Sequence, residues 1–169
     1  MMKAQTITKK ECHETALGYL ANRDRSDYEV VSYLISKGFL QDEVDEELEY
    51  LKELNYVDNV RYCEDYFQYA MKKGRGPVRI RLELKEKGIE EDLIQLTLER
   101  YFDNETEKKA ALSEANKLLE RGIVSNCGSG EEKIIDEKTL AKIGRRLTSL
   151  GYHGDVVYYI IGQLRKSER

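Results

Sequence analysis

The sequence has few of the features that build β-sheets, membrane spans or secretion signals. It contains a single proline, Pro77, and its valine, isoleucine and threonine residues never form alternating runs, which disfavours a β-sandwich or barrel. No apolar run approaches the roughly 20 residues that cross a bilayer, and no signal-peptide core follows the N-terminal Met-Met-Lys. We therefore expect an all-α, cytoplasmic protein with no membrane association.

Residues that commonly carry catalysis or hold metals are also scarce. The three cysteines, Cys12, Cys63 and Cys127, are widely spaced and form no metal-binding motif, so we interpret them as buried or idle thiols. The only histidines, His13 and His153, lie beside expected helix starts without obvious catalytic partners. No glycine-rich phosphate loop is present. We predict no catalytic residue, no metal and no cofactor.

An internal repeat is the most informative feature of the 169 residues. Gly38, Gly88 and Gly151 each follow an amphipathic helical pattern, and each is followed by a large apolar residue. A second apolar series comes 6, 10 and 13 residues after each glycine. A helix that ends at a left-handed glycine brings the next residue back against the helix, so we predict three helical hairpins. The contacting pairs are Leu34/Phe39, Leu84/Ile89 and Leu147/Tyr152.

Helix-start signals agree with these hairpins. Ser26 and Glu29 have the spacing of a capping box, Gly76-Pro77 suits an N-cap followed by the first helical position, and Asp136 is an acceptable cap. A further helical stretch precedes each hairpin, at 13–23, 59–73 and 104–121. We therefore predict three tandem three-helix units in an elongated, curved repeat array. Their ranges are 12–56, 57–103 and 104–169, after a flexible N-terminus at 1–11 and with a loop insertion near 123–135.

Charge is unevenly distributed, although Lys plus Arg (28) nearly balances Asp plus Glu (32). Residues 72–87 hold seven basic and two acidic side chains, whereas residues 40–59 hold eight acidic and one basic. A solvated face and a binding patch explain the basic segment about equally well. Because the equivalent positions of the first unit are Arg25, Glu29, Val31 and Ile35, the fold itself does not demand this charge. The candidate partner-binding or DNA-binding residues are Arg75, Arg79, Arg81, Lys85, Lys142, Arg145 and Arg146.

Three tyrosines, Tyr62, Tyr66 and Tyr69, recur on one face of the helix expected at 59–73. Tyrosine rings can stack on nucleic-acid bases. The corresponding residues of the first unit, Cys12, Ala16 and Tyr19, suggest a helix-packing face instead. We predict that the three tyrosines belong to the core.

Two segments resemble the RecX family of regulatory proteins. The first is Ala16-Leu17-Gly18-Tyr19-Leu20 with 23–26 and 34–39. The second resembles the family's central signature, with Tyr56-Val57-Asp58-Asn59, Arg61-Tyr62, Gly74-Arg75-Gly76-Pro77-Val78-Arg79-Ile80-Arg81, Glu83-Leu84 and Lys87-Gly88-Ile89. Asn59, Tyr62 and Cys63 depart mildly from that signature. The resemblance runs from about Ala16 to Tyr101.

The resemblance implies a three-unit α-protein that binds the RecA recombinase filament on single-stranded DNA. It implies inhibition of strand exchange, ATP hydrolysis and repressor cleavage, with no enzymatic activity of its own. We expect a monomer that binds DNA weakly or through the filament. Two alternatives remain open: a stand-alone DNA-binding module of helix-turn-helix type, and a helical scaffold that binds only protein.

Overall fold

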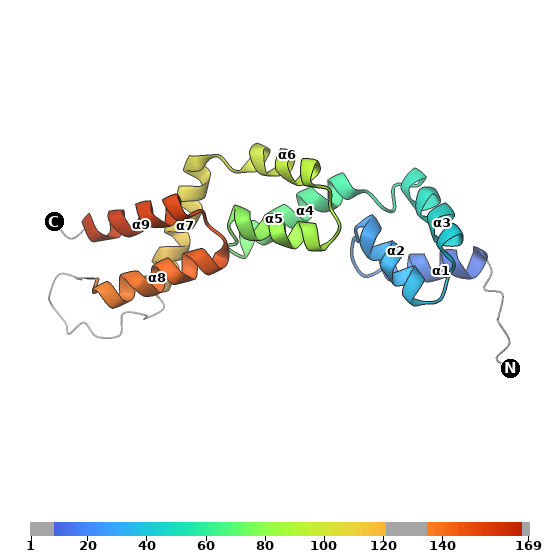
Figure 1. The fold of residues 1–169 in the computed structure, drawn as a ribbon, viewed down its shortest axis with the longest axis horizontal. Helices are drawn as coiled ribbons and strands as arrows, with labels where there is room; N and C mark the ends of the chain where they lie inside the picture. Colours follow the sequence, from blue (N-terminus) through green and yellow to red (C-terminus); the bar gives the residue numbers. More distant parts are fainter. Residues whose placement is uncertain (1–8, 121–134, 167–169) are drawn as a thin grey trace. The chain divides into compact units, whose positions relative to one another are not determined.

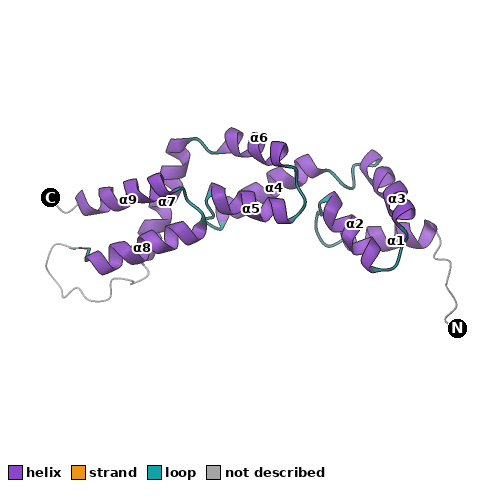
Figure 2. Ribbon diagram, in the orientation of Figure 1, coloured by secondary structure: helices purple, strands orange, loops and turns teal. Residues whose placement is uncertain are grey.

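The computed structural model describes residues 9–120 and 135–166, which contain nine α-helices and no strand (Figures 1 and 2). The all-α prediction is therefore confirmed for the described residues. The helices are α1 (Lys9–Leu20), α2 (Asp27–Ser36), α3 (Gln41–Glu53), α4 (Asn59–Lys72), α5 (Pro77–Glu86), α6 (Glu91–Tyr101), α7 (Asn104–Leu118), α8 (Glu137–Leu150) and α9 (Gly154–Lys166).

Each predicted hairpin turn is present. Gly38, Gly88 and Gly151 have φ values of 94°, 74° and 86°, and the residue after each glycine donates a backbone hydrogen bond to the predicted leucine carbonyl. These bonds measure 3.4 Å for Phe39 to Leu34, 3.1 Å for Ile89 to Leu84 and 3.2 Å for Tyr152 to Leu147. The repeated Schellman-type helix ends are confirmed.

The predicted helix starts are also confirmed. The Ser26 hydroxyl accepts from the Glu29 N–H at 3.1 Å, while the Glu29 carboxylate accepts from the Ser26 N–H at 3.2 Å. Pro77 is the first residue of α5, and the Asp136 carboxylate accepts from the Thr139 N–H at 2.9 Å. Some boundaries differ from the prediction. α1 runs from Lys9 to Leu20 rather than over 13–23, and α7 ends at Leu118 rather than at 121.

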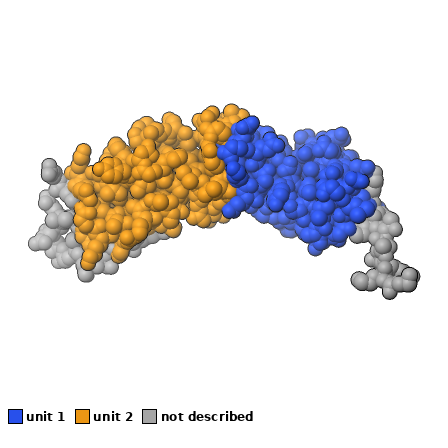
Figure 3. Space-filling view, viewed as in Figure 1, with its two compact units in different colours: residues 1–66, 84–94 blue, residues 67–83, 95–169 orange. Residues whose placement is uncertain are grey.

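The chain divides into two compact units (Figure 3). The first comprises 1–66 and 84–94, and the second comprises 67–83 and 95–169, so the division passes through α4, α5 and α6. The three-helix boundaries at 12–56, 57–103 and 104–169 describe the sequence repeat and stay a prediction. Of the flexible N-terminus expected at 1–11, residues 1–8 lie outside the described residues, and residues 9–11 belong to α1. Residues 123–134 of the insertion expected at 123–135 also lie outside the described residues.

Each unit has its own apolar core. In the first unit, α1, α2 and α3 bury Cys12, Ala16, Val30, Leu34, Phe39, Val44, Leu48 and Leu51, together with Val57. In the second unit, α7, α8 and α9 bury Ala111, Ala115, Leu140, Ile143, Leu147, Leu150, Val156, Val157, Ile160 and Leu164, together with Tyr152. The apolar i, i+3/i+4 pattern of each helix therefore marks its buried face.

Candidate functional site

The basic segment begins at a sharp turn between α4 and α5. Gly74 has a φ of 71°, and the Arg75 N–H donates to the Ala70 carbonyl at 3.1 Å. Gly74 thus ends α4 as the repeat glycines end α2, α5 and α8, a role that sequence reasoning missed. A signal was present, since Ala70 and Arg75 stand at the same spacing from Gly74 as Leu34 and Phe39 do from Gly38.

The start of α5 packs on the end of α8 within the second unit, and we call this contact the α5–α8 junction. The Gly76 N–H donates to the Leu150 carbonyl at 2.7 Å, and the Val78 N–H donates to the Gly151 carbonyl at 3.0 Å. A Cβ atom at Gly76 would lie 2.5 Å from the Gly151 backbone. Backbone contact this close is possible only because Gly76 has no side chain.

Arg75 and Arg79 converge on one carboxylate beside this junction. An Arg75 Nη atom lies 2.7 Å from Glu83 Oε2, and Arg79 Nε lies 2.9 Å from Glu83 Oε1. Arg79 also donates to the Ser149 carbonyl at 3.2 Å. These arginines therefore have structural partners in the fold, and our inference that the fold places no demand on their charge was wrong for this pair.

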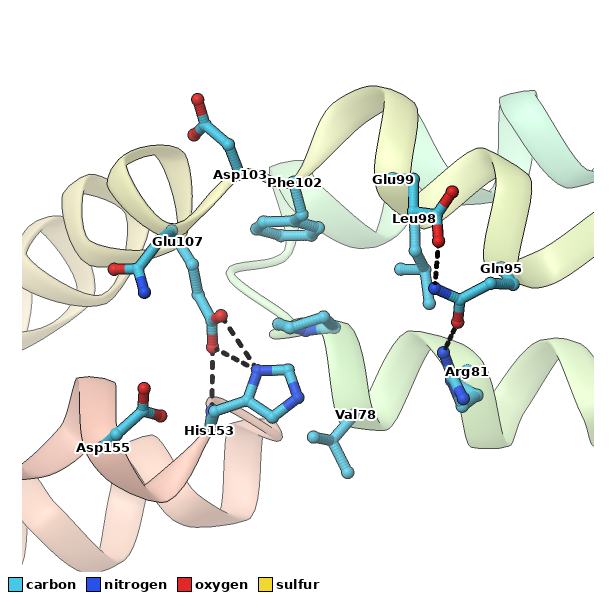
Figure 4. Close-up of a pocket in the computed structure, with 12 residues that line it drawn as sticks. Val78, Arg81, Gln95, Leu98, Glu99, Phe102, Asp103, Glu107, His153 and Asp155 are labelled. Carbon is cyan, nitrogen blue, oxygen red and sulfur yellow. Dashed lines mark hydrogen bonds and ion pairs between the residues drawn. The ribbon is translucent and has the colours of Figure 1, made fainter.

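The other two candidates on α5 also have partners. The Arg81 guanidinium donates to the side-chain oxygen of Gln95, and the Gln95 amide donates to Glu99 at 2.6 Å (Figure 4). Lys85 Nζ lies 3.3 Å from Glu91, but its side chain is 67% exposed. An exposed ion pair of this kind is weak and easily exchanged for another partner.

The three candidates on α8 have a different environment. Lys142, Arg145 and Arg146 are exposed, whereas Ile143 and Leu147 of the same helix are buried. Residues three and four apart share a helix face, so Lys142 lies beside both arginines. None of these three cationic groups forms a hydrogen bond or ion pair with any residue in 9–120 or 135–166. The α8 basic face, defined by these three residues, can therefore contact an anionic partner without first breaking a bond to those residues.

The tyrosines of α4 do not share one environment. Tyr62 is buried, Tyr66 is half-buried and Tyr69 is 49% exposed, so the core prediction holds for Tyr62 and is wrong for Tyr69. The Lys73 ammonium and the Arg75 guanidinium lie 5.7 and 5.6 Å from the centre of the Tyr69 ring. Arg25 lies 4.0 Å from the equivalent ring, Tyr19, in the first unit, so this cation–π contact recurs with the repeat.

Both histidines have carboxylate partners that sequence reasoning did not anticipate. His13 Nδ1 lies 2.8 Å from Glu47, and His153 Nδ1 lies 2.9 Å from the buried Glu107. Glu107 also accepts the His153 backbone N–H at 2.8 Å. Both pairs link residues distant in sequence, and each ties one helix start or helix face to a neighbouring helix.

Two of the three cysteines, Cys12 and Cys63, are buried thiols, as predicted. Burial raises the pKa of Cys12 to about 11, with a further contribution from the negative charges of Glu47 and Glu43. A thiol with so high a pKa is a poor nucleophile. Cys127 lies outside the described residues.

Neither a metal site nor a membrane span is found in the part of the chain that the structure describes. No cluster of three or more His, Cys, Asp or Glu side chains there is arranged to hold a metal ion. None of the helices in that part is long and apolar enough to cross a bilayer.

Comparison with known proteins identifies two family domains in the chain. Residues 12–51 match the RecX first three-helix domain, and residues 58–98 match the RecX second three-helix domain. The chain is 29% identical to the "Regulatory protein RecX" of Vibrio campbellii, over 95% of this chain and 94% of that protein. It is 40% identical over 91 residues to the protein of the same name from Legionella pneumophila, a match that covers 54% of this chain and 61% of the relative.

A solved structure has the same fold. The RecX crystal structure from Lactobacillus salivarius superimposes with a TM-score of 0.74 at 26% identity, covering 92% of this chain and 96% of that chain. The succession of three-helix units, the two matched family domains and the relative from Vibrio campbellii agree with one another. The chain belongs to the RecX family of regulatory proteins.

Proposed function

We propose that this chain binds the RecA recombinase filament on single-stranded DNA and inhibits strand exchange, ATP hydrolysis and coprotease function. It acts in the cytoplasm as a regulator in recombination and the SOS response, and it has no catalytic activity of its own. The observation that carries the proposal is the match to both RecX three-helix domains across 12–51 and 58–98, together with relatives named as regulatory proteins.

The α8 basic face is the surface that we assign to phosphate contact. Lys142, Arg145 and Arg146 are exposed on one helix, and charge-assisted contacts to phosphate oxygens are strong and sequence-independent. The α5 arginines are less available because Glu83, Ser149 and Gln95 already accept their hydrogen bonds. Among the α5 candidates, Lys85 loses the least stabilising interaction when it binds a partner, because its side chain is largely exposed and its ion pair with Glu91 is weak.

The test measures ATP hydrolysis by RecA on single-stranded DNA with substoichiometric amounts of this protein. The wild-type chain is expected to reduce hydrolysis, whereas the variant K142Q/R145Q/R146Q is expected to need more than tenfold higher concentration for half-inhibition. Each lost charge-assisted contact costs on the order of 1–3 kcal/mol, and about 1.4 kcal/mol is tenfold in affinity.

A matched control removes the same charge elsewhere in the second unit. The variant K109Q/K117Q/R165Q changes three exposed cations outside the α8 basic face, and it is expected to inhibit within about twofold of wild type. If wild type leaves hydrolysis unchanged, the proposed function is wrong. If both triple variants lose inhibition equally, net charge matters and the α8 basic face has no special role.

Salt dependence separates the alternatives of a DNA-binding module and a protein scaffold. A stand-alone DNA-binding module would bind bare single-stranded DNA tightly, with an affinity that falls steeply as salt rises. A scaffold that binds only protein would ignore DNA. We expect weak binding to bare DNA and much tighter binding to RecA filaments at the same salt concentration.

A further inference from the structure

A cleft of about 610 Å³ lies within the second compact unit, between α5, α6 and the starts of α7 and α9 (Figure 4). Its apolar part is formed by Pro77, Val78, Leu98 and Phe102. Polar and charged side chains lie around this part, with Glu107, His153 and Asp155 on one side and Arg81 and Glu99 on the other (Figure 4). We name it the α5–α9 cleft.

Helix N-termini commonly attract anions, but those of this cleft are already occupied. Pro77 at the start of α5 has no N–H, and the flanking Gly76 and Val78 N–H groups donate to the Leu150 and Gly151 carbonyls at the end of α8. The Asp103 carboxylate accepts the Thr106 N–H of α7 at 2.7 Å. Glu107 accepts the His153 N–H before α9 at 2.8 Å. A phosphate or carboxylate ligand would have to displace these internal bonds.

The charge of the cleft lining favours a cation instead. The cleft lining includes four acidic residues, Glu99, Asp103, Glu107 and Asp155, and one arginine, Arg81. With His153 neutral the lining carries a net charge of −3, and with His153 protonated it carries −2. Hydrogen bonds from the Thr106 side chain and backbone lower the pKa of Asp103, so this carboxylate stays ionised at neutral pH. Asp103 and Asp155 are exposed to solvent.

The apolar part of the cleft selects the kind of cation. Phe102 is half-buried and Val78 is 39% exposed, so both present apolar surface to a ligand. A metal ion would gain nothing from these side chains, whereas an arginine packs its methylene groups on apolar surface and its guanidinium on an aromatic ring. The planar guanidinium also pairs with carboxylates through two parallel hydrogen bonds. We propose that the α5–α9 cleft binds an arginine side chain presented by a segment of a protein partner.

The probe is the peptide acetyl-Gly-Ser-Leu-Arg-Ser-Gly-amide, titrated into the 15N-labelled full-length chain and followed by NMR. Its matched control replaces arginine with citrulline, which keeps the shape and removes the charge. We expect the largest shifts at the backbone amides of Val78, Phe102 and Asp103, and at least fivefold weaker binding of the citrulline peptide. These results do not depend on RecA, so the cleft and the proposed function are tested separately.

A pair of double variants tests the carboxylates. D103N/D155N removes two charges of the cleft, while asparagine keeps the N-cap of α7 because it caps helices as well as aspartate does. E105Q/E137Q removes two exposed charges of the same unit outside the cleft. We expect D103N/D155N to weaken the arginine peptide at least fivefold and E105Q/E137Q to stay within twofold.

Three results would overturn the proposal. The first is equal binding of the arginine and citrulline peptides. The second is an equal loss in both double variants. The third is a set of shifts centred on the acidic face of α3, at 42–49, rather than on the cleft. Melting curves of all variants confirm that any loss of binding occurs in a folded chain.

Discussion

The chain has two equivalent junctions between successive helical hairpins, one in each compact unit. The two junctions are made by different hydrogen bonds. In the first unit, the start of α2 contacts the end of α5, and the Ser26 hydroxyl donates to the Lys87 carbonyl at 2.6 Å. We call this the α2–α5 junction. In the second unit, the α5–α8 junction uses the Gly76 backbone N–H, which donates to the Leu150 carbonyl at 2.7 Å. Ser26 and Gly76 occupy the same position of the repeat.

The ion pairs beside the two junctions also differ. Glu29 of the α2–α5 junction lies 3.0 Å from Arg23, 3.5 Å from Lys87 and 3.8 Å from Arg25. At the α5–α8 junction, Glu83 is bound by Arg75 and Arg79 at 2.7 and 2.9 Å. A serine junction relies on a side chain and a loose group of cations, whereas a glycine junction relies on direct backbone contact. The two junctions therefore form at the same position of the repeat, but with different residues and different hydrogen bonds.

The largest expected effect follows from Gly151→Ala at the α5–α8 junction. Gly151 has a φ of 86°, and a Cβ atom there would lie 2.4 Å from the Arg79 backbone nitrogen. Left-handed strain costs about 1 kcal/mol and overpacking adds about 1–3 kcal/mol. We expect a loss of about 2–4 kcal/mol in the free energy of unfolding, measured by urea denaturation and circular dichroism.

Gly38→Ala is the matched control for this substitution. Gly38 has a φ of 94°, and apart from its two chain neighbours no described residue has a heavy atom within 4 Å of the point that a Cβ atom would occupy. Only the backbone strain of about 1 kcal/mol therefore remains. Equal losses in the two variants would mean that the α5–α8 junction adds nothing to the requirement for glycine at position 151.

A smaller effect is expected for Ser26→Ala at the α2–α5 junction. This change removes both the cap of α2 and the hydrogen bond to the Lys87 carbonyl, at a residue that is completely buried. The loss of a cap costs about 1 kcal/mol, and leaving the partly buried Lys87 carbonyl without its donor adds up to about 1 kcal/mol. Urea denaturation should show a loss of about 1–2 kcal/mol. A loss below about 0.5 kcal/mol would show that water replaces the hydroxyl at this junction.

Sequence patterns predicted the helix ends but not these junctions, and the reason is physical. A Schellman-type end or a capping box is made by residues within about five positions of each other, so Gly151 and Ser26 carry their local signal in the sequence. The Ser26–Lys87 and Arg79–Ser149 bonds join residues 61 and 70 positions apart. No local period encodes such pairs. For the same reason, the prediction missed the structural partners of the α5 arginines and wrongly placed Tyr69 in the core. The exposed face of α8, in contrast, agrees with its helical periodicity.

The pH dependence of stability tests Glu29. Burial of Glu29 opposes its ionisation, but the hydrogen bond from the Ser26 N–H and the charges of Lys87 and Arg23 outweigh burial, so its pKa is lowered in the folded chain. A lowered folded-state pKa means that ionised Glu29 stabilises the fold above its unfolded-state pKa, and that this contribution disappears as pH falls through the folded-state pKa.

We therefore expect Glu29→Gln to lower the free energy of unfolding by about 1 kcal/mol at pH 7. The difference from wild type should shrink as pH falls from about 4.3, the ordinary pKa of glutamate, toward the lower folded-state pKa, because below that pKa the wild-type side chain is neutral as well. Urea titrations at about pH 7, 5 and 3.5 measure it. A difference that is constant with pH would mean that Glu29 acts through its hydrogen bonds alone and not through its charge.

The smallest expected effect is that of Lys85→Gln, near the end of α5 that meets α2. The Lys85 and Glu91 side chains are 67% and 43% exposed, and exposed pairs of this kind contribute between 0 and about 1 kcal/mol. We expect the free energy of unfolding to change by less than about 0.5 kcal/mol. The comparison is Arg79→Gln, which removes bonds to both Glu83 and Ser149.

If Lys85→Gln weakens inhibition of RecA without changing stability, the Lys85 charge acts directly on the partner. A loss of stability as large as that of Arg79→Gln would instead place Lys85 among the structural residues of the α2–α5 junction.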